Sequence, residues 1–293
     1  MTSKTTFSSL EGEDKYRAFS YAQMKRDRIN DALFRTIALK QTDLYPHMYI
    51  SGPPGLGKTH MVTVNLEGGD TPYVTISGNQ SLFAFGLALC VLQHTNTNLD
   101  PVFVFVDDVD FLLTDGDCLN TLKNCLEGQK RFVYEKYLTL TINNLDEDHK
   151  AAVEHFSQAG KMGFSVPTHN LIFIFTSNIR LPDDKEVIQA IQKATGRSKI
   201  LIHRNAIRNR VRNYDIQLTD AEHWGWLYHA AHSSNTLSAM GLERPQINNI
   251  LDFIWDNWHR LSEHSVRTVL KMADIYVHHA HSYTEIWKMD FLN

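Results

Sequence analysis

The stretch Gly52-Pro-Pro-Gly-Leu-Gly-Lys58-Thr59 contains every fixed position of the phosphate-binding pattern G-x-x-x-x-G-K-[ST]. It follows a short apolar stretch, Met48–Ile50, and precedes a helical pattern, which is the strand, loop and helix context that this pattern needs. The glycines let the loop curl so that successive N–H groups point at phosphate oxygens, and the next helix adds its positive amino end. We therefore expect a nucleotide site in which Lys58 reaches the β- and γ-phosphates and Thr59 holds Mg²⁺. The predicted phosphate-binding residues are Gly52, Pro53, Pro54, Gly55, Leu56, Gly57, Lys58, Thr59 and His60.

Composition limits what else the chain can be. Its 293 residues allow one large domain or two modest ones, and 43% apolar with 21% charged residues is ordinary globular usage. The net charge of −4 excludes a strongly basic coat protein for nucleic acid. The three cysteines, Cys90, Cys118 and Cys125, form no C-x-x-C pair, which predicts neither disulfides nor a cysteine zinc site. The polar first 14 residues and the short apolar runs predict a cytoplasmic protein without a signal peptide or membrane span.

Two apolar runs predict the class of fold. Val102–Val106 and Leu171–Phe175 are β-branched and aromatic without alternation, as strands are when both faces of a parallel sheet are covered. Met48–Ile50 and Tyr73–Ile76 are shorter strand predictions, and helical periodicity fills the gaps between them. Strands that alternate with helices predict an α/β fold with a parallel sheet.

The sequence changes character near Ile216. From there on no strand pattern is convincing, and all five tryptophans lie in this part of the chain. Leu251, Ile254, Trp255 and Trp258 follow the spacing of one face of a helix, which predicts that the tryptophans form an apolar core. We therefore predict two domains, an α/β nucleotide-binding domain over residues 1–215 and a small all-helical domain over residues 216–293.

Polar residues follow both of the long apolar strands. Asp107 and Asp108 come directly after Val102–Val106, and ligands of open α/β sheets bind at that edge. We expect Asp107 to hold Mg²⁺ through water and Asp108 to orient or deprotonate the water that attacks the γ-phosphate. We interpret Asp110 as a turn residue or helix cap. Asn178, after the other strand, could help to place the same water; the alternative is an ordinary polar turn.

In this order, the phosphate loop, the acidic pair and Asn178 resemble Walker A, Walker B and sensor 1 of the AAA+ ATPases. Two later segments extend the resemblance. Ala206-Ile-Arg-Asn-Arg210 resembles the arginine-finger segment, with Arg210 the best positional match and Arg208 the alternative. Ser265-Val-Arg267 resembles the sensor 2 helix, whose arginine touches the γ-phosphate.

The resemblance covers about residues 45–280 and implies a parallel five-stranded P-loop core with a helical lid. It also implies Mg²⁺-dependent hydrolysis of ATP to ADP and phosphate, with ATP bound between the subunits of a homo-oligomeric ring, usually of six. The chain loosely resembles the small loader-type and phage-encoded members, which share its build of a lone ATPase domain. One position departs from the family, because Asp108 stands where most members have glutamate, which puts the rate of turnover in question more than nucleotide binding.

Residues 111–170 form a long insertion between two strands. Alternating apolar residues from Phe132 to Ile142 predict a strand or hairpin, either facing a ring pore or peripheral. The run from Lys193 to Tyr214 has seven positive charges and no acid. We interpret its end, from Arg208, as a subunit interface; its beginning could instead contact nucleic acid.

Three functions remain open from the sequence. The first is an ATPase that loads or moves nucleic acid, the second a protein remodeller, and the third a slowly hydrolysing, ATP-dependent assembly switch. Phe85-Gly86 is the nearest match to the pore loop of protein-threading relatives, but it lies in a predicted helix, which favours the first. We interpret His278, His279 and His281 as surface histidines and not as zinc ligands.

Overall fold

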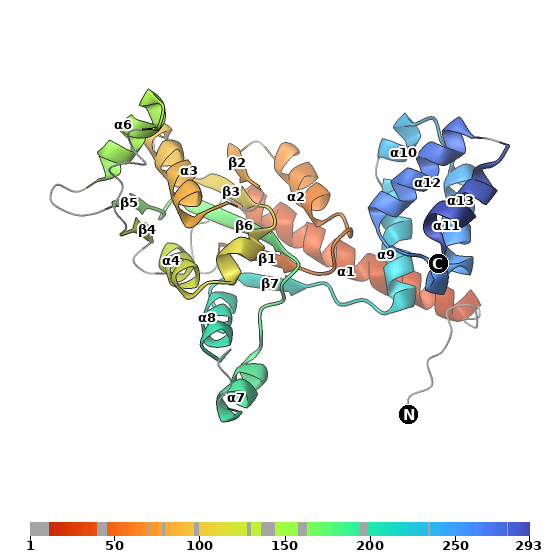
Figure 1. Ribbon diagram of the computed structural model, residues 1–293, viewed down its shortest axis with the longest axis horizontal. Coiled ribbons are helices and arrows are strands. Elements are labelled where there is room, and N and C mark those ends of the chain that lie inside the picture. Colours follow the sequence, from red (N-terminus) through yellow and green to blue (C-terminus); the bar gives the residue numbers. More distant parts are fainter. Residues whose placement is uncertain are drawn as a thin grey trace. The chain divides into compact units, whose positions relative to one another are not determined.

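The computed structural model describes most of the chain and divides it into two compact units (Figure 1). Unit 1 comprises Met1–Ala32, Pro53–Met61 and Ile216–Asn293, and unit 2 comprises Leu33–Gly52 and Val62–Asp215. The residues described are 12–39, 46–69, 71–77, 80–96, 100–127, 130–135, 144–157, 163–193, 198–233, 235–279 and 281–293. The units meet in sequence at Ile216, but unit 1 also includes two earlier segments, so domains at 1–215 and 216–293 stay a prediction.

Unit 2 is built on a five-stranded parallel sheet, which confirms the predicted fold class. Every residue of the two central strands that the sequence predicted is buried, as their unbroken apolar runs require. The edge strand beside β1 was not predicted, because its sequence, Arg-Asn-Tyr-Asp, is polar and only half-buried. In order across the sheet the strands are β2 Tyr73–Ile76, β3 Val102–Val106, β6 Leu171–Ser177, β1 Met48–Ser51 and β7 Arg212–Asp215.

Helices join and cover these strands, and two of them, α1 and α2, run from one unit into the other. The core of unit 2 contains buried residues of the sheet and of α3 and α4. The helices are α1 Gly12–Leu39, α2 Lys58–Glu67, α3 Leu82–Thr95, the 3-10 helix η2 Val109–Leu113, α4 Gly116–Leu126, α6 Glu147–Phe156, α7 Asp184–Gln192 and α8 Ser198–Arg208.

The insertion contributes a second, two-stranded sheet. Its strands, β4 Arg131–Tyr134 and β5 Phe164–Pro167, pair antiparallel. The Phe132 side chain is fully buried and stacks on Phe164, with ring centroids 5.9 Å apart. Phe132 is therefore a core residue, while Leu138, Leu140 and Ile142 of the predicted hairpin lie outside the described residues.

The carboxyl-terminal part of unit 1 is helical, and four of its tryptophans lie in one apolar core, as predicted. Trp224 and Trp287 donate their indole N–H groups to buried carbonyls, of Leu251 and Met272, each over 3.0 Å. No helix within the described ranges is long and apolar enough to cross a bilayer. The elements are α9 Asp220–Ser233, α10 Asn235–Ala239, α11 Arg244–Asp256, the 3-10 helix η3 Trp258–Arg260, α12 Val266–His278 and α13 Tyr283–Phe291.

The part of α1 up to Ala32 belongs to the same unit and packs on α9. Gly225 of α9 allows this close approach, because a Cβ there would lie 3.0 Å from the Cα of Phe19. Lys25 also forms an ion pair with Glu222 over 2.9 Å. His278, His279 and His281 are exposed, and the described residues contain no cluster of three or more potential metal ligands.

Candidate functional site

The predicted phosphate loop has the curled backbone that its sequence requires. Gly55 and Gly57 have φ angles of 78° and 76°, a left-handed conformation that is costly for residues with a Cβ. The loop leaves the sheet at Gly52, whose N–H donates to the carbonyl of Ser177 at the end of β6 over 3.2 Å. Lys58 then begins α2, so the loop leads directly into the amino end of a helix.

The donors of this loop suit a polyphosphate. The Lys58 side chain is 6% exposed, and its ammonium donates to the Pro53 carbonyl over 2.8 Å. That carbonyl is a neutral acceptor, which a charged phosphate oxygen can outcompete. Thr59 and His60 lie exposed in the first turn of α2, where the helix dipole also favours an anion.

Within unit 1, the start of α12 packs directly on this loop. The N–H of Val266 donates to the carbonyl of Gly55 over 2.8 Å, and a Cβ on Gly55 would lie 2.3 Å from the Cβ of Ser265. Ser265 caps α12 by accepting from the N–H of Thr268 over 3.1 Å. Arg267, the predicted sensor 2 residue, is the second residue of α12 and is exposed.

A second contact from the helical part of unit 1 supports the loop. The indole N–H of Trp226, which is fully buried, donates to the carbonyl of Leu56 over 2.8 Å. The roles of Trp226 and Ser265 were not predicted from the sequence. No local sequence pattern predicts these contacts, because both residues lie far from the loop in the sequence and reach it only in the folded chain.

The predicted acidic pair lies at the carboxyl edge of the sheet in unit 2, beside the end of β6. Thr176 holds both residues, because its hydroxyl donates to the Asp107 carboxylate and accepts from the N–H of Asp108. Asp107 is half-buried, whereas Asp108 is exposed and has a φ angle of 53°. Aspartate tolerates this left-handed conformation better than most residues, so the turn itself favours aspartate at position 108.

Asn178 is anchored at the same edge by Asp110, which the sequence predicted only as a turn residue or helix cap. The Asp110 carboxylate accepts from the Ser177 hydroxyl and, over 3.1 Å, from the backbone N–H of Asn178. The Asn178 side chain is exposed. The carbonyl of Ser177 also accepts from the N–H of Gly52, where the phosphate loop begins. One edge of the sheet therefore carries the beginning of this loop, the acidic pair and Asn178.

The surroundings of Asp110 are buried and polar. The Tyr49 hydroxyl donates to the carbonyl of Ile179, and burial raises the pKa of this phenol, which keeps it neutral. Arg204 donates to the carbonyl of Leu113 over 2.9 Å. Burial lowers the pKa of the Arg204 guanidinium, and attraction to Tyr49 and Asp110 opposes this effect.

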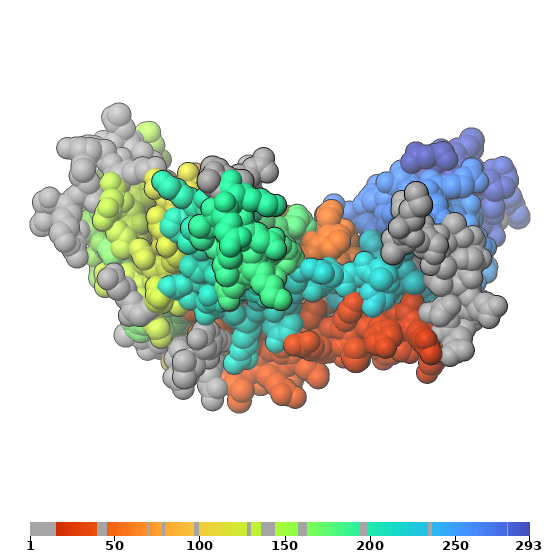
Figure 2. All heavy atoms as spheres, turned by 90° about the horizontal axis from the view of Figure 1, so that it is seen from below, coloured from red at the N-terminus to blue at the C-terminus, as the bar shows by residue number. Residues whose placement is uncertain are grey.

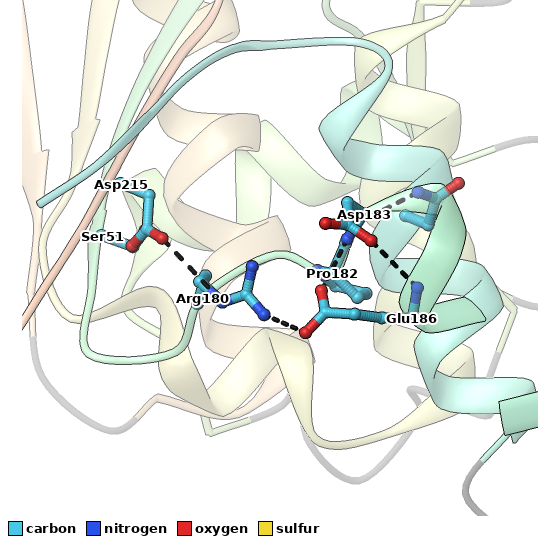
Figure 3. A network of polar contacts seen from close by, with 7 residues as sticks. Ser51, Arg180, Pro182, Asp183, Glu186 and Asp215 are labelled. Atoms are coloured by element: carbon cyan, nitrogen blue, oxygen red, sulfur yellow. Dashed lines mark hydrogen bonds and ion pairs between the residues drawn. The ribbon is translucent and has the colours of Figure 1, made fainter. Parts of the chain in front are cut away.

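A polar network beyond Asn178 joins the ends of three strands (Figure 3). Arg180 forms an ion pair with Glu186 and lies 3.9 Å from a carboxylate oxygen of Asp215 at the end of β7. Asp215 in turn accepts from the Ser51 hydroxyl, at the end of β1, over 3.0 Å. Glu186 completes a capping box with Asp183 at the start of α7. This network, which was not predicted from the sequence, ties α7 to the sheet edge.

The two arginines proposed for the finger differ in their surroundings. The Arg210 guanidinium donates to the carbonyl of Ala206 and to the Glu127 carboxylate of the same chain. Arg208 instead lines a polar cavity of about 420 Å³ with Asp183, Asp184, Lys185, Asn205 and Asn209. In this structure Arg210 is therefore engaged within its own chain, although it was the better positional match.

The parallel sheet, the curled loop and the helix that begins at its lysine define a P-loop nucleotide-binding protein. Residues 48–197, about half of the chain, match the ATPase family associated with various cellular activities (AAA). The chain belongs to this family. A comparison with curated proteins gives no match. Among solved structures, a proline-to-glycine variant of RuvB from Thermotoga maritima is 15% identical, with a TM-score of 0.43, covering 93% of this chain and 71% of that chain.

Proposed function

We propose that this AAA ATPase hydrolyses ATP to ADP and phosphate with Mg²⁺. The phosphate loop carries the proposal, because its two left-handed glycines and its buried Lys58 lead directly into α2. In this proposal Lys58 binds the β- and γ-phosphates, and Thr59 and Asp107 hold the metal. A bound Mg²⁺ supplies charge neutralisation for the phosphates.

The other proposed roles concern the attacking water. Asp108 accepts the proton of a water whose oxygen bonds to the γ-phosphorus, and the bond from this phosphorus to the bridging oxygen breaks to release ADP. Asn178 positions that water, and Arg267 stabilises charge on the γ-phosphate. The Thr176 contacts that fix Asp107 and Asp108 support a shared task for the pair.

We further propose that the chain acts as a homo-oligomeric ring, of six subunits by family precedent, in which an arginine acts on the ATP of its neighbour. Arg210 is the proposed finger by position. Its pairing with Glu127 means that it must leave this partner to act, whereas Arg208 already lines an open cavity. Mixing Arg210→Ala and Lys58→Ala subunits tests the idea, because some sites then combine an intact loop with an intact finger. Absence of recovered activity, with concentration-independent turnover of the unmodified protein, would show that each chain holds a complete site.

For the substrate we favour nucleic acid, in the role of a loader or motor. Phe85, the nearest match to a protein-gripping pore aromatic, is 1% exposed in the core of unit 2, and Phe132 of the insertion is also buried. Their burial weakens the alternative of a protein remodeller. The exposed, short side chain of Asp108 leaves a slow assembly switch as the third possibility.

Two measurements test the function. The first is binding of a fluorescent ATP analogue, which Lys58→Ala should weaken strongly because a cation beside the polyphosphate is lost; unchanged binding would refute the site. The second is the ATPase rate with and without DNA, RNA or an unfolded protein. Stimulation by nucleic acid alone supports the loader, and stimulation by the unfolded protein alone supports the remodeller. ATP-dependent assembly with negligible turnover in every condition supports the switch.

A further inference from the structure

Unit 2 carries an open apolar groove between the carboxyl-terminal ends of α1 and α2. It has a volume of about 380 Å³ and includes the exposed side chains of Phe34 and Val64. Phe34 is 68% exposed and Val64 50% exposed, although both lie on helices whose other faces are buried. The remaining lining residues are Ile37, Ala38, Asn65, Gly68, Gly69 and Thr71.

One buried polar group in this groove has no hydrogen-bond partner in the described ranges. Thr71 is only 8% exposed, and among the described residues its buried hydroxyl oxygen makes no hydrogen bond. Leaving a buried hydroxyl without a partner costs about 1–3 kcal/mol. A polar group of an occupant would remove this penalty, so the groove has the character of an incomplete interface.

A second unpaired apolar surface lies on α7. None of the residues of this helix is buried, and Ile188 and Ile191, three positions apart on one face, are 53% and 52% exposed. Figure 2 shows α7, in green, at the front of unit 2 when the molecule is seen from below. The capping box and the Arg180 ion pair anchor the start of α7, which presents this surface on a well-formed helix.

We propose that α7 of one copy of the chain docks its Ile188 and Ile191 face into the groove of a second copy. Within unit 2, Figure 1 shows α7 below the parallel sheet and α2 above it, so the two surfaces lie apart in one copy. Two different patches that pair between identical chains make a head-to-tail contact, and such contacts build a ring where the rotation closes.

The exposed charges beside the two surfaces also match. Asp184 and Lys185 precede Ile188 by four and three positions and are exposed on α7. Arg35 is exposed on α1 three positions before Ala38, and Glu67 is exposed on α2 three positions after Val64, so each neighbours a residue that lines the groove. Each surface thus offers at least one acid and one base around an apolar centre, which allows two opposite-charge pairs across the contact.

This inference rests on the assembly in the proposed function and names the surfaces that produce it. Because α7 packs on α8, docking α7 also brings the Arg208 end of α8 to the neighbouring copy. The groove lies at the carboxyl end of α2, a helix of 10 residues that begins at Lys58, so its two ends are about 15 Å apart. The contact would therefore bring the arginine segment of one copy towards the phosphate-loop helix of the next.

The test uses two one-sided variants of the full chain and a matched control. Ile188→Asp/Ile191→Asp removes the α7 face, Val64→Asp places a charge in the groove, and Val277→Asp changes an apolar residue of α12 that is 43% exposed. Mass photometry and sedimentation velocity with ATP measure assembly. Each one-sided variant should dissociate at a concentration roughly tenfold higher or more than the unmodified chain, and Val277→Asp should assemble normally.

The decisive sample is an equal mixture of the two one-sided variants. The intact α7 of the Val64→Asp chain can enter the intact groove of the other chain, but both outer ends are then blocked. The mixture should therefore stop at a heterodimer, while each variant alone stays monomeric. Three results would each overturn the docking proposal. They are normal assembly of either variant, the absence of a heterodimer in the mixture, and an unmodified chain that stays monomeric with ATP.

The result separates this proposal from the proposed function. Binding and hydrolysis of ATP by the unmodified chain test the function, and size measurements test the docking surfaces. Ring formation through other surfaces, with ATP turnover intact, would refute only the docking. If the unmodified chain does not bind ATP, the proposed function is refuted, whatever the state of assembly of the chain.

Discussion

Replacing Gly55 by alanine tests how closely α12 packs on the phosphate loop, and Gly57→Ala is its matched control. Both glycines have left-handed backbones, with φ angles of 78° and 76°. An added Cβ at Gly55 would lie 2.3 Å from the Cβ of Ser265, whereas one at Gly57 would lie 3.9 Å from the nearest atom, in Val266. Only the first substitution forces α12 to move, although both strain the backbone.

The two substitutions differ in their cost in free energy of unfolding, because only Gly55→Ala adds a steric overlap. The left-handed conformation costs a residue with a Cβ about 1–2 kcal/mol, which applies to both variants. Overpacking adds about 1–3 kcal/mol for Gly55→Ala alone, because carbon atoms pack at about 3.5–4.0 Å. We expect a total of about 2–5 kcal/mol for Gly55→Ala and about 1–2 kcal/mol for Gly57→Ala.

Amide hydrogen exchange at Val266 reports this difference locally. Its N–H donates to the Gly55 carbonyl over 2.8 Å, so moving α12 away exposes this amide. Gly55→Ala should accelerate its exchange by roughly tenfold or more relative to Gly57→Ala, since 1.4 kcal/mol is a factor of ten. Thermal denaturation of both variants measures the accompanying loss of stability.

A second substitution in the same chain checks the cause. Ser265→Gly removes the Cβ that Gly55→Ala meets, and glycine replaces serine as a helix cap at a cost of only a few tenths of a kcal/mol. The double variant Gly55→Ala/Ser265→Gly should therefore be more stable than the sum of the single effects predicts. Equal exchange of Val266 in Gly55→Ala and Gly57→Ala, or strictly additive effects in the double variant, would refute the packing argument.

Asp108→Asn should keep ATP bound but lower single-turnover hydrolysis by roughly a hundredfold or more, because the base at the water is lost; a normal rate would exclude this residue. If Arg210 is the finger, Arg210→Ala abolishes turnover in the assembled protein while Glu127→Gln, which breaks the same ion pair, retains it; if Arg208→Ala alone abolishes turnover, Arg208 is the finger. Burial lowers the pKa of His47 to about 3 from the ordinary 6.5. Between these values the unfolded chain binds a proton that the folded chain excludes, so stability should be complete above about pH 6.5 and fall towards about pH 3. Melting temperatures across this range should fall less steeply in His47→Asn, and an equal slope would contradict the assignment.

The sequence predicts those strands whose residues are all buried. Val102–Val106 coincides with β3, and Leu171–Phe175 is only two residues shorter than β6, because strands covered on both faces need apolar residues at every position. β7 could not be predicted in this way. Its residues, Arg212–Asp215, are polar and half-buried. They form a strand because they pair in parallel with the edge of β1 that β6 leaves open.

The finger segment shows the same limit for function. Its arginines are recognisable from their order after Asn178, but the sequence does not distinguish Arg208 from Arg210. The structure separates them, because Glu127, from a distant part of the chain, pairs with Arg210 and leaves Arg208 beside a polar cavity. Such pairings depend on how α4 and α8 pack, which no local pattern encodes.

The phosphate loop could be read from eight consecutive residues, because glycines at the left-handed positions and a lysine at the helix start are local requirements of the backbone. The contacts that hold the site belong to the tertiary structure. Ser265 meets Gly55 in unit 1, and Thr176 joins Asp107 to Asp108 in unit 2, across separations along the chain at which periodicity carries no information. Serine and threonine are also common in turns and caps, so their residue type alone does not identify these partners; only the folded chain brings the atoms within hydrogen-bonding and packing distance.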